Sequence, residues 1–309
     1  MQQDSGRTLA NFVQHLAIQA FLGTARLLPF RARGNWFATA GRFAIPRVPS
    51  LRNRMAEGMR LVYPDLTEAE LSDFIRRTAA NTSRTFSEIL FNKEYARHLE
   101  LFHPTGPGLD VLRRAKAEGQ GVLIVSAHLG QWEAIRHYLR DQGMETGAMY
   151  RLNENPWYEK TFLANIEQAG LPIIAKSRTA TIQMIRHIRK GGFFAMLADQ
   201  KHRLGYKLPF LGHDAMTTVA PATLANRYGF PVVPCFGLRR ANGFDIDVIF
   251  EEPLTPADVL TMTREMNDRI SAQIRAHPDQ WHWLHRRWSD LHYHDLVHGA
   301  EGDDLLGDD

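Results

Sequence analysis

The feature that most constrains the fold is an apolar run that passes abruptly into polar residues. Residues 121–133 read Gly-Val-Leu-Ile-Val-Ser-Ala-His-Leu-Gly-Gln-Trp-Glu. The apolar positions from Val122 to Val125 follow a glycine, carry no polar side chain, and are mostly β-branched. A strand with no polar face is typical of a parallel sheet that helices cover on both sides. The sequence therefore predicts an α/β fold with a mostly parallel central sheet flanked by helices.

Strand and helix patterns alternate along the rest of the chain and support this prediction. A capping box formed by Thr67 and Glu70 opens the first long helix. The stretch 102–108, rich in Pro and Gly, is predicted to be a connector, and residues 201–217 a loop. The helices are expected at 67–98, about 109–117, 130–142, 156–168, 178–189, 218–228 and 257–276, and the strands at 121–127, 146–150, 172–175, 193–198, 231–237 and 244–250.

Composition limits the classes of function that remain open. The chain has 309 residues, enough for one large domain with a sizeable core. Its formal net charge is only +3, so no general affinity for nucleic acid is expected. A single cysteine, Cys235, excludes an internal disulfide framework and fits a reducing compartment. The polar residues 1–8 do not resemble a secretory signal, and we expect the protein to remain in the cytoplasm.

The amino-terminal 60 residues form a helical region that favours contact with a membrane. Residues 9–28 are apolar apart from a narrow stripe that includes His15, Gln19 and Arg26, a pattern typical of a helix lying in the membrane interface. Residues 26–60 contain eight arginines and one acidic residue, which suits an anionic surface. We therefore predict three parts: an interfacial helix and basic collar at 1–60, an α/β domain at 61–298, and a disordered acidic tail at 299–309.

Two residues that follow the first buried strand have the spacing of a catalytic pair. His128 lies just beyond the strand, and Glu133 lies in the first turn of the next helix. A neutral imidazole can take a proton from a hydroxyl while a carboxylate on its other nitrogen fixes the tautomer. The sequence therefore predicts His128 as a general base and Glu133 as its partner.

Polar residues also follow two further strands, at the edge where open α/β sheets place their sites. An arginine there could meet an oxyanion or bind a substrate phosphate. The chain has no Gly-x-Ser-x-Gly nucleophile elbow, so direct attack by an acceptor hydroxyl is the simpler mechanism. The predicted site comprises His128, Glu133, Arg151, Asn153, Asp199 and Gln200.

These motifs together resemble one family, the late acyltransferases of lipid A biosynthesis in Gram-negative bacteria, which belong to the lysophospholipid-acyltransferase-like superfamily. The resemblance covers nearly the whole chain, through SAHLGQWE, YRLNENP, LADQ, PFLGHDAMTTVAPATLANRYGFPVVP and PDQWHWLHRRW. It implies transfer of a fatty acyl group from acyl carrier protein to a hydroxyl of a lipid A precursor, without a metal or other cofactor. His128 would be the base with Glu133, and the other four site residues would bind substrate. It further implies work at the cytoplasmic face of the inner membrane, peripherally or by an amino-terminal anchor.

Three other interpretations stay open at this point. The acceptor could be another membrane lipid, such as a lysophospholipid or a glycosylated phosphoinositide, and assays on defined acceptors would decide. A metal-dependent hydrolase could use His282 and His285, with three further histidines nearby, but no acidic residue completes a recognised metal motif. A non-catalytic membrane-binding module would leave the polar strand ends without a purpose.

Overall fold

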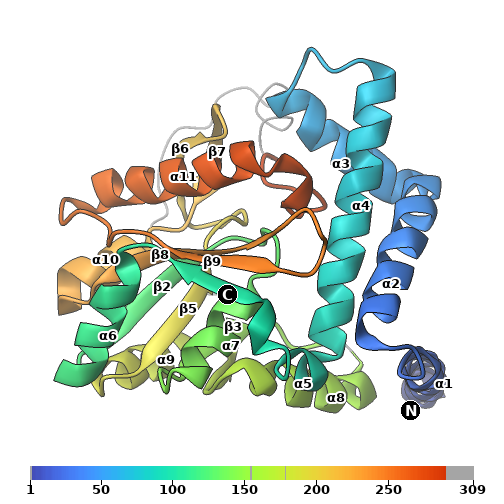
Figure 1. The fold of residues 1–309 in the computed structure, drawn as a ribbon, viewed down its shortest axis with the longest axis horizontal. Coiled ribbons are helices and arrows are strands. Elements are labelled where there is room, and N and C mark those ends of the chain that lie inside the picture. The colour runs from blue at the N-terminus through green and yellow to red at the C-terminus, as the bar shows by residue number, and fades with distance from the viewer. Residues whose placement is uncertain (1, 154, 178, 290–309) are drawn as a thin grey trace.

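A seven-stranded sheet forms the centre of the computed structural model, which describes residues 2–153, 155–177 and 179–289 (Figure 1). Within the described chain, antiparallel pairing in this sheet occurs only between its β8 and β9 strands. The predicted mostly parallel α/β architecture is therefore confirmed. In spatial order the strands are β1 (Phe102–Thr105), β9 (Ile246–Phe250), β8 (Val232–Arg239), β2 (Val122–Ser126), β5 (Phe193–Leu197), β3 (Thr146–Tyr150) and β4 (Ile173–Ala175).

The central strand β2 is buried along its whole length, as its apolar sequence predicts. Alternate side chains point to opposite faces of a strand, so β2 contributes to both cores. Leu123 and Val125 pack in one cluster, beside helices α9 (Ala180–Arg189), α10 (Ala220–Tyr228) and α11 (Val259–Ala276). Val122 and Ile124 pack in the other, beside α6 (Gly108–Glu118) and α7 (Glu133–Asp141). Burying each such side chain contributes about 1.5–3 kcal/mol, which anchors the strand that leads to His128.

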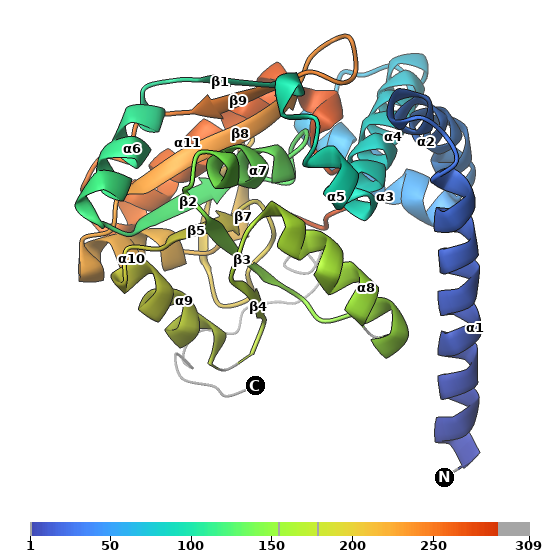
Figure 2. The same cartoon turned by 60° about the horizontal axis from the view of Figure 1, so that its bottom comes forward.

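The amino-terminal helices lie to one side of the sheet (Figure 1). They are α1 (Gln2–Ala25), α2 (Phe30–Ala44), α3 (Pro49–Val62) and α4 (Glu68–Leu90), with a short turn η1 (Ile45–Arg47) before α3. The predicted capping box is present at the start of α4, where Thr67 and Glu70 exchange hydrogen bonds. Helix α1 projects along the edge of the protein, beside α8 (Pro156–Ile166) (Figure 2). In the described chain, no helix has the length and apolarity required to span a bilayer.

Some predicted elements differ from the observed ones. The expected helix 67–98 ends at Leu90, and the short α5 (Asn92–Tyr95) and η2 (Leu99–Leu101) follow it. The expected connector at 102–108 contains β1, whose four residues pair with the distant β9 and carry too little periodicity to be recognised. The expected loop at 201–217 contains an antiparallel hairpin, β6 (Tyr206–Phe210) and β7 (His213–Thr217).

The last part of the described chain, after α11, packs into the core. The segment 281–288 packs against the core of the domain, where Trp281, Trp283 and Trp288 are buried. It follows the 3-10 turn η4 (Pro278–Gln280) and packs without forming a helix. A second 3-10 turn, η3 (Glu167–Ala169), directly follows α8. The predicted acidic tail at 299–309 lies outside the described residues, and the three-part division of the chain stays a prediction.

Candidate functional site

Two neighbouring strands bring His128 and Asp199 together. Strands β2 and β5 are parallel and in register, with Ser126 opposite Leu197. The chain beyond each strand therefore emerges at the same edge, and the Ala198 N–H donates to the Ser126 carbonyl at 2.8 Å. His128 Nδ1 lies 2.8 Å from Asp199 Oδ1, and the His128 backbone N–H donates to Asp199 Oδ2 at 2.8 Å. This is the crevice in which an open α/β sheet places its chemistry.

Asp199 is completely buried yet fully hydrogen-bonded. Its Oδ2 also accepts a hydrogen bond from Trp281 Nε1 at 2.8 Å, so three donors converge on one carboxylate. Burial raises the pKa of this carboxyl, but the charge and hydrogen bond of His128, aided by His285 and Trp281, outweigh burial and hold the pKa well below its usual range. Asp199 is therefore ionised, and its charge fixes the proton of His128 on Nδ1 and leaves Nε2 as the basic nitrogen.

The Nε2 side of His128 faces an amide and a second histidine. Gln200 Nε2 lies 3.4 Å from His128 Nε2 and 3.2 Å from His285 Nε2. Burial lowers the pKa of His285 to about 4, with a further contribution from the charge of His128. Burial likewise lowers the pKa of the adjacent His282 to about 3. Both rings are thus neutral near pH 7, and the imidazole of His128 is 18% exposed.

Glu133 is not the partner of His128 that the spacing predicts. Its carboxylate pairs with Arg136 at 2.8 Å, one turn further along α7. Arg136 in turn donates to the carbonyls of Thr146 and Gly170, so this pair ties α7 to β3 and to the turn before β4. The carboxylate on Nδ1 of His128 belongs to Asp199, which corrects the predicted pairing. The cause is geometric, because Glu133 begins α7 and residues three apart on a helix are neighbours, so its carboxylate meets Arg136.

Arg151 and Asn153 follow β3, two strands away from β2 in the sheet. Asn153 is held locally, since its backbone N–H and its Nδ2 both donate to Glu159 Oε2, at 2.9 and 2.8 Å. Arg151 and Leu152 are exposed at the same edge of the sheet as His128. The structure thus brings His128, Asp199 and Gln200 into one cluster and leaves the substrate-binding roles of Arg151 and Asn153 as predictions.

Sequence reasoning missed the contribution of the carboxyl-terminal segment. Trp281 binds Asp199, His285 faces Gln200, and the buried Arg287 donates to the carbonyls of Gln200 and Met216. This segment also pairs with the loop that carries His128, because the His282 N–H donates to the His128 carbonyl at 2.9 Å. The run WHWLHRRW at 281–288 mixes tryptophans with histidines and arginines, a pattern that indicates a packed segment with some polar side chains. Its position beside β2 depends on a long-range contact, which the local sequence does not reveal.

One cluster in the described chain has the composition of a metal site. His128, Asp199 and His285 each offer a ligand atom within 4.8 Å of the other two. The protein itself supplies donors to both oxygens of Asp199, including the ring of His128, so the three groups are already held by hydrogen bonds. In the described chain the cluster is a hydrogen-bonded group of side chains, and the expectation that no metal is required stays a prediction.

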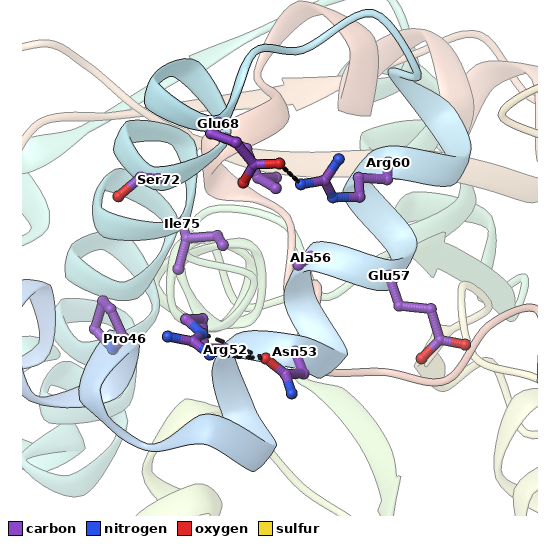
Figure 3. Close-up of a pocket in the computed structure, with 10 residues that line it drawn as sticks. Pro46, Arg52, Asn53, Ala56, Glu57, Arg60, Glu68, Ser72 and Ile75 are labelled. Carbon is purple, nitrogen blue, oxygen red and sulfur yellow. Dashed lines mark hydrogen bonds and ion pairs between the residues drawn. The ribbon is translucent and has the colours of Figure 1, made fainter.

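A separate cavity of about 590 Å³ lies between α3 and α4 (Figure 3). Its floor is apolar and includes Leu71 and Ile75, while its rim carries two arginines and two glutamates. Arg60 pairs with Glu68 across the cleft, and Arg52 donates to Asn53 at 3.3 Å. The opposite charges of the rim balance, and the residues predicted for catalysis do not line this cavity. It is therefore distinct from the site around His128.

Comparison with known proteins shows which family the chain resembles. Residues 3–290 match the family model described as bacterial lipid A biosynthesis acyltransferase. The phosphatidylinositol mannoside acyltransferase of Mycobacterium tuberculosis is 28% identical over 186 residues, which is 59% of this chain and 58% of that protein, so the match spans less than two thirds of that relative.

Two relatives match over more of their length. The lipid A biosynthesis myristoyltransferase of Escherichia coli is 23% identical over 279 residues, 87% of this chain and 84% of that protein. The lipid A biosynthesis acyltransferase of Haemophilus influenzae is 22% identical over 270 residues, 85% of this chain and 84% of that protein. Since the family model covers nearly the whole chain, the protein belongs to the bacterial lipid A biosynthesis acyltransferase family.

Proposed function

We propose that the protein transfers a fatty acyl group from acyl carrier protein to a hydroxyl of a lipid A precursor. The observation that carries this proposal is the contact between His128 Nδ1 and Asp199 Oδ1 at 2.8 Å, which leaves Nε2 basic at the mouth of the site. The family to which the chain belongs supports acyl transfer as the reaction. The donor, the acceptor and the base are parts of the proposal.

The proposed chemistry needs no covalent enzyme intermediate. His128 Nε2 takes the proton of the acceptor hydroxyl as its oxygen attacks the thioester carbonyl, and a C–O bond forms. Asp199 stabilises the imidazolium that results. The C–S bond then breaks, and the imidazolium returns its proton to the leaving thiolate, so that ester and thiol are the products. Cys235 is an unsuitable nucleophile, since it is buried and burial raises the pKa of its thiol.

The decisive experiment offers the purified protein acyl carrier protein loaded with a series of acyl chains and a defined lipid A precursor. Mass spectrometry should show the acceptor gaining one acyl chain in an ester. A glycosylated phosphoinositide belongs in the same assay, because the mycobacterial relatives are named for a mannosylated acceptor of that kind. Transfer to the phosphoinositide alone would replace the lipid A precursor as the acceptor, and absence of transfer from any acyl thioester would overturn the proposal.

The exposed side of α1 supports a place on a membrane surface, which we propose is the cytoplasmic face of the inner membrane. Gln19 donates to Thr161 of α8, so the polar stripe faces the protein at this position, while Arg26 near its end is exposed. The outward side carries apolar residues of which Val13 and Leu16 are 55% and 50% exposed. Further exposed apolar side chains are Phe12 and Phe21 on α1, and Leu27, Leu28, Trp36, Phe43 and Val48 in residues 26–60, where exposed arginines also lie. This combination suits docking on an anionic bilayer.

We predict that the protein floats with anionic vesicles and that binding weakens as salt rises. Arginines close to the surface contribute about 1 kcal/mol each at physiological salt, and salt screens this term. Arg33 adds nothing to it, because it is buried against Glu94. The double variant Val13→Asp/Leu16→Asp should lose most flotation, while Ile182→Asp, which charges an equally exposed apolar residue on α9, should retain it. Flotation of the double variant at the wild-type level would rule out the α1 face.

Arg151 provides a test of substrate binding at the edge of the site. Lysine keeps the charge but loses the planar fork that grips a phosphate or carboxylate, so kcat/KM of Arg151→Lys should fall on the order of 10-fold. Arg114→Lys on α6 is the matched control, because it changes an exposed arginine near the opposite edge of the sheet. Kinetic constants of Arg151→Lys that equal those of the control would mean that Arg151 does not bind substrate.

A further inference from the structure

A buried ion pair lies behind the loop that carries His128 and takes no part in the chemistry proposed above. It joins Glu88 of α4 to Arg239 at the end of β8, and each side chain is only 3% exposed. Arg239 Nη1 and Nη2 donate to Glu88 Oε1 and Oε2 at 2.8 and 2.6 Å, a two-pronged contact of the strong kind. Burying two charges costs desolvation free energy that their attraction only partly offsets, so net stability does not explain this pair.

The ion pair reaches the catalytic loop through two polar side chains. Gln131 is completely buried, and its Nε2 donates to Glu88 Oε2 at 2.6 Å. Thr85 accepts a hydrogen bond from Arg239 Nη2 at 3.2 Å and donates from Oγ1 to the Gly130 carbonyl at 2.9 Å. Gln131 is thus bound by Glu88 directly, and Gly130 is bound by Thr85, which contacts Arg239. His128 lies two residues before Gly130.

The opposite side of the loop is fixed as tightly. The Gly130 N–H donates to the Gln280 carbonyl at 3.0 Å, and the Gln131 N–H donates to the Gly237 carbonyl at 2.7 Å. Gly130 has a φ of +58°, and a Cβ there would lie 2.1 Å from the Gly237 carbonyl oxygen. Only glycine fits this approach, and the loop therefore rests between β8, the 280–282 segment and α4 without room to shift.

We infer that Glu88 and Arg239 are positioning residues, which act through Thr85 and Gln131 to hold His128 in the geometry that proton transfer requires. This inference rests on the proposed role of His128 as the base. A base must lie within hydrogen-bond reach of the proton it removes, and a misplacement near 1 Å can cost about 100-fold in rate. A rigid support behind the loop prevents that loss.

The sharpest test is Thr85→Val, which keeps the shape of the side chain and removes the hydroxyl that binds Gly130. We expect kcat to fall about 10-fold or more while KM stays within about 2-fold, because the loop loses one anchor and substrate contacts are untouched. Thr78→Val is the matched control. Thr78 lies on the same helix and is buried to 1% exposure, as Thr85 is to 2%, but its hydroxyl has no hydrogen-bond partner among the described residues. The control should keep wild-type kcat.

A second readout needs no substrate. In protein labelled with ¹⁵N-histidine, the His128 ring signals are assigned by their loss in His128→Ala. They should shift or broaden in Thr85→Val and remain unchanged in Thr78→Val, with both variants folded by circular dichroism. Unchanged kcat and unchanged His128 signals in folded Thr85→Val would overturn the inference.

These outcomes separate the inference from the proposed function. If His128→Ala retained full turnover, the proposed base would be wrong, whatever Thr85→Val did. If His128→Ala were inactive and Thr85→Val matched Thr78→Val in both readouts, the base would stand and the positioning role would fail. Glu88→Asp gives a further check, because the shorter carboxylate cannot reach Arg239 and Gln131 together, and it should lower kcat as Thr85→Val does.

Discussion

His128→Ala is expected to lower the rate of acyl transfer by about 10²–10⁴-fold, the usual contribution of a general base. The substitution removes the imidazole whose Nε2 is proposed to take the hydroxyl proton and whose Nδ1 contacts Asp199. It should leave the fold intact, because His128 lies in a loop beyond β2 and its backbone hydrogen bonds to Asp199 and His282 do not need the side chain. The measurement is single-turnover transfer from an acyl thioester, alongside thermal unfolding.

The control for this experiment is His103→Ala, which removes a partly exposed histidine on β1 that also contacts a carboxylate, Asp245. It should retain wild-type transfer. If folded His128→Ala turned over substrate like His103→Ala, acid–base chemistry at this histidine would not be part of the mechanism.

The sequence predicts the central fold well where a pattern is local. The run Val122–Val125 has no polar face, and the structure buries each of these residues completely, at the middle of the sheet. Capping of α4 by Thr67 and Glu70 is equally local and is confirmed. Strand β1 was missed because its identity depends on β9, more than 140 residues later, and four residues carry no useful periodicity by themselves.

The difference between local patterns and long-range contacts also explains which predictions for the site are correct and which are wrong. The sequence predicts His128, Asp199 and Gln200 as site residues because each follows a buried strand, and these strands prove to be neighbours. It pairs His128 with Glu133 because the two are close in sequence, whereas the actual partner is 71 residues away. Trp281 and His285 enter the site from a segment without strand or helix, so no periodicity indicates which side chains face the crevice.

Because Asp199 is the carboxylate that contacts His128 Nδ1, Asp199→Asn is expected to cause a second large loss of kcat. Asparagine keeps the shape of aspartate but has one acceptor oxygen and one NH₂ group. The oxygen would remain at the Oδ2 position, where the His128 N–H and the Trp281 indole both donate. The NH₂ group would then face His128 Nδ1, which must become an acceptor, and the ring proton moves to Nε2. Because Nε2 can no longer take the hydroxyl proton, kcat should fall by up to about 10⁴-fold.

Glu133→Gln decides between the two carboxylates. Glu133 binds Arg136 and not the base, so its substitution should cost stability by weakening the contact between α7 and β3, with a much smaller loss of kcat in the folded protein. The ¹⁵N spectrum provides a direct check, since Asp199→Asn should convert His128 to the tautomer protonated at Nε2 and Glu133→Gln should not. A loss of kcat in folded Glu133→Gln as large as that in Asp199→Asn, together with an unchanged His128 tautomer in the latter, would return the role of partner to Glu133.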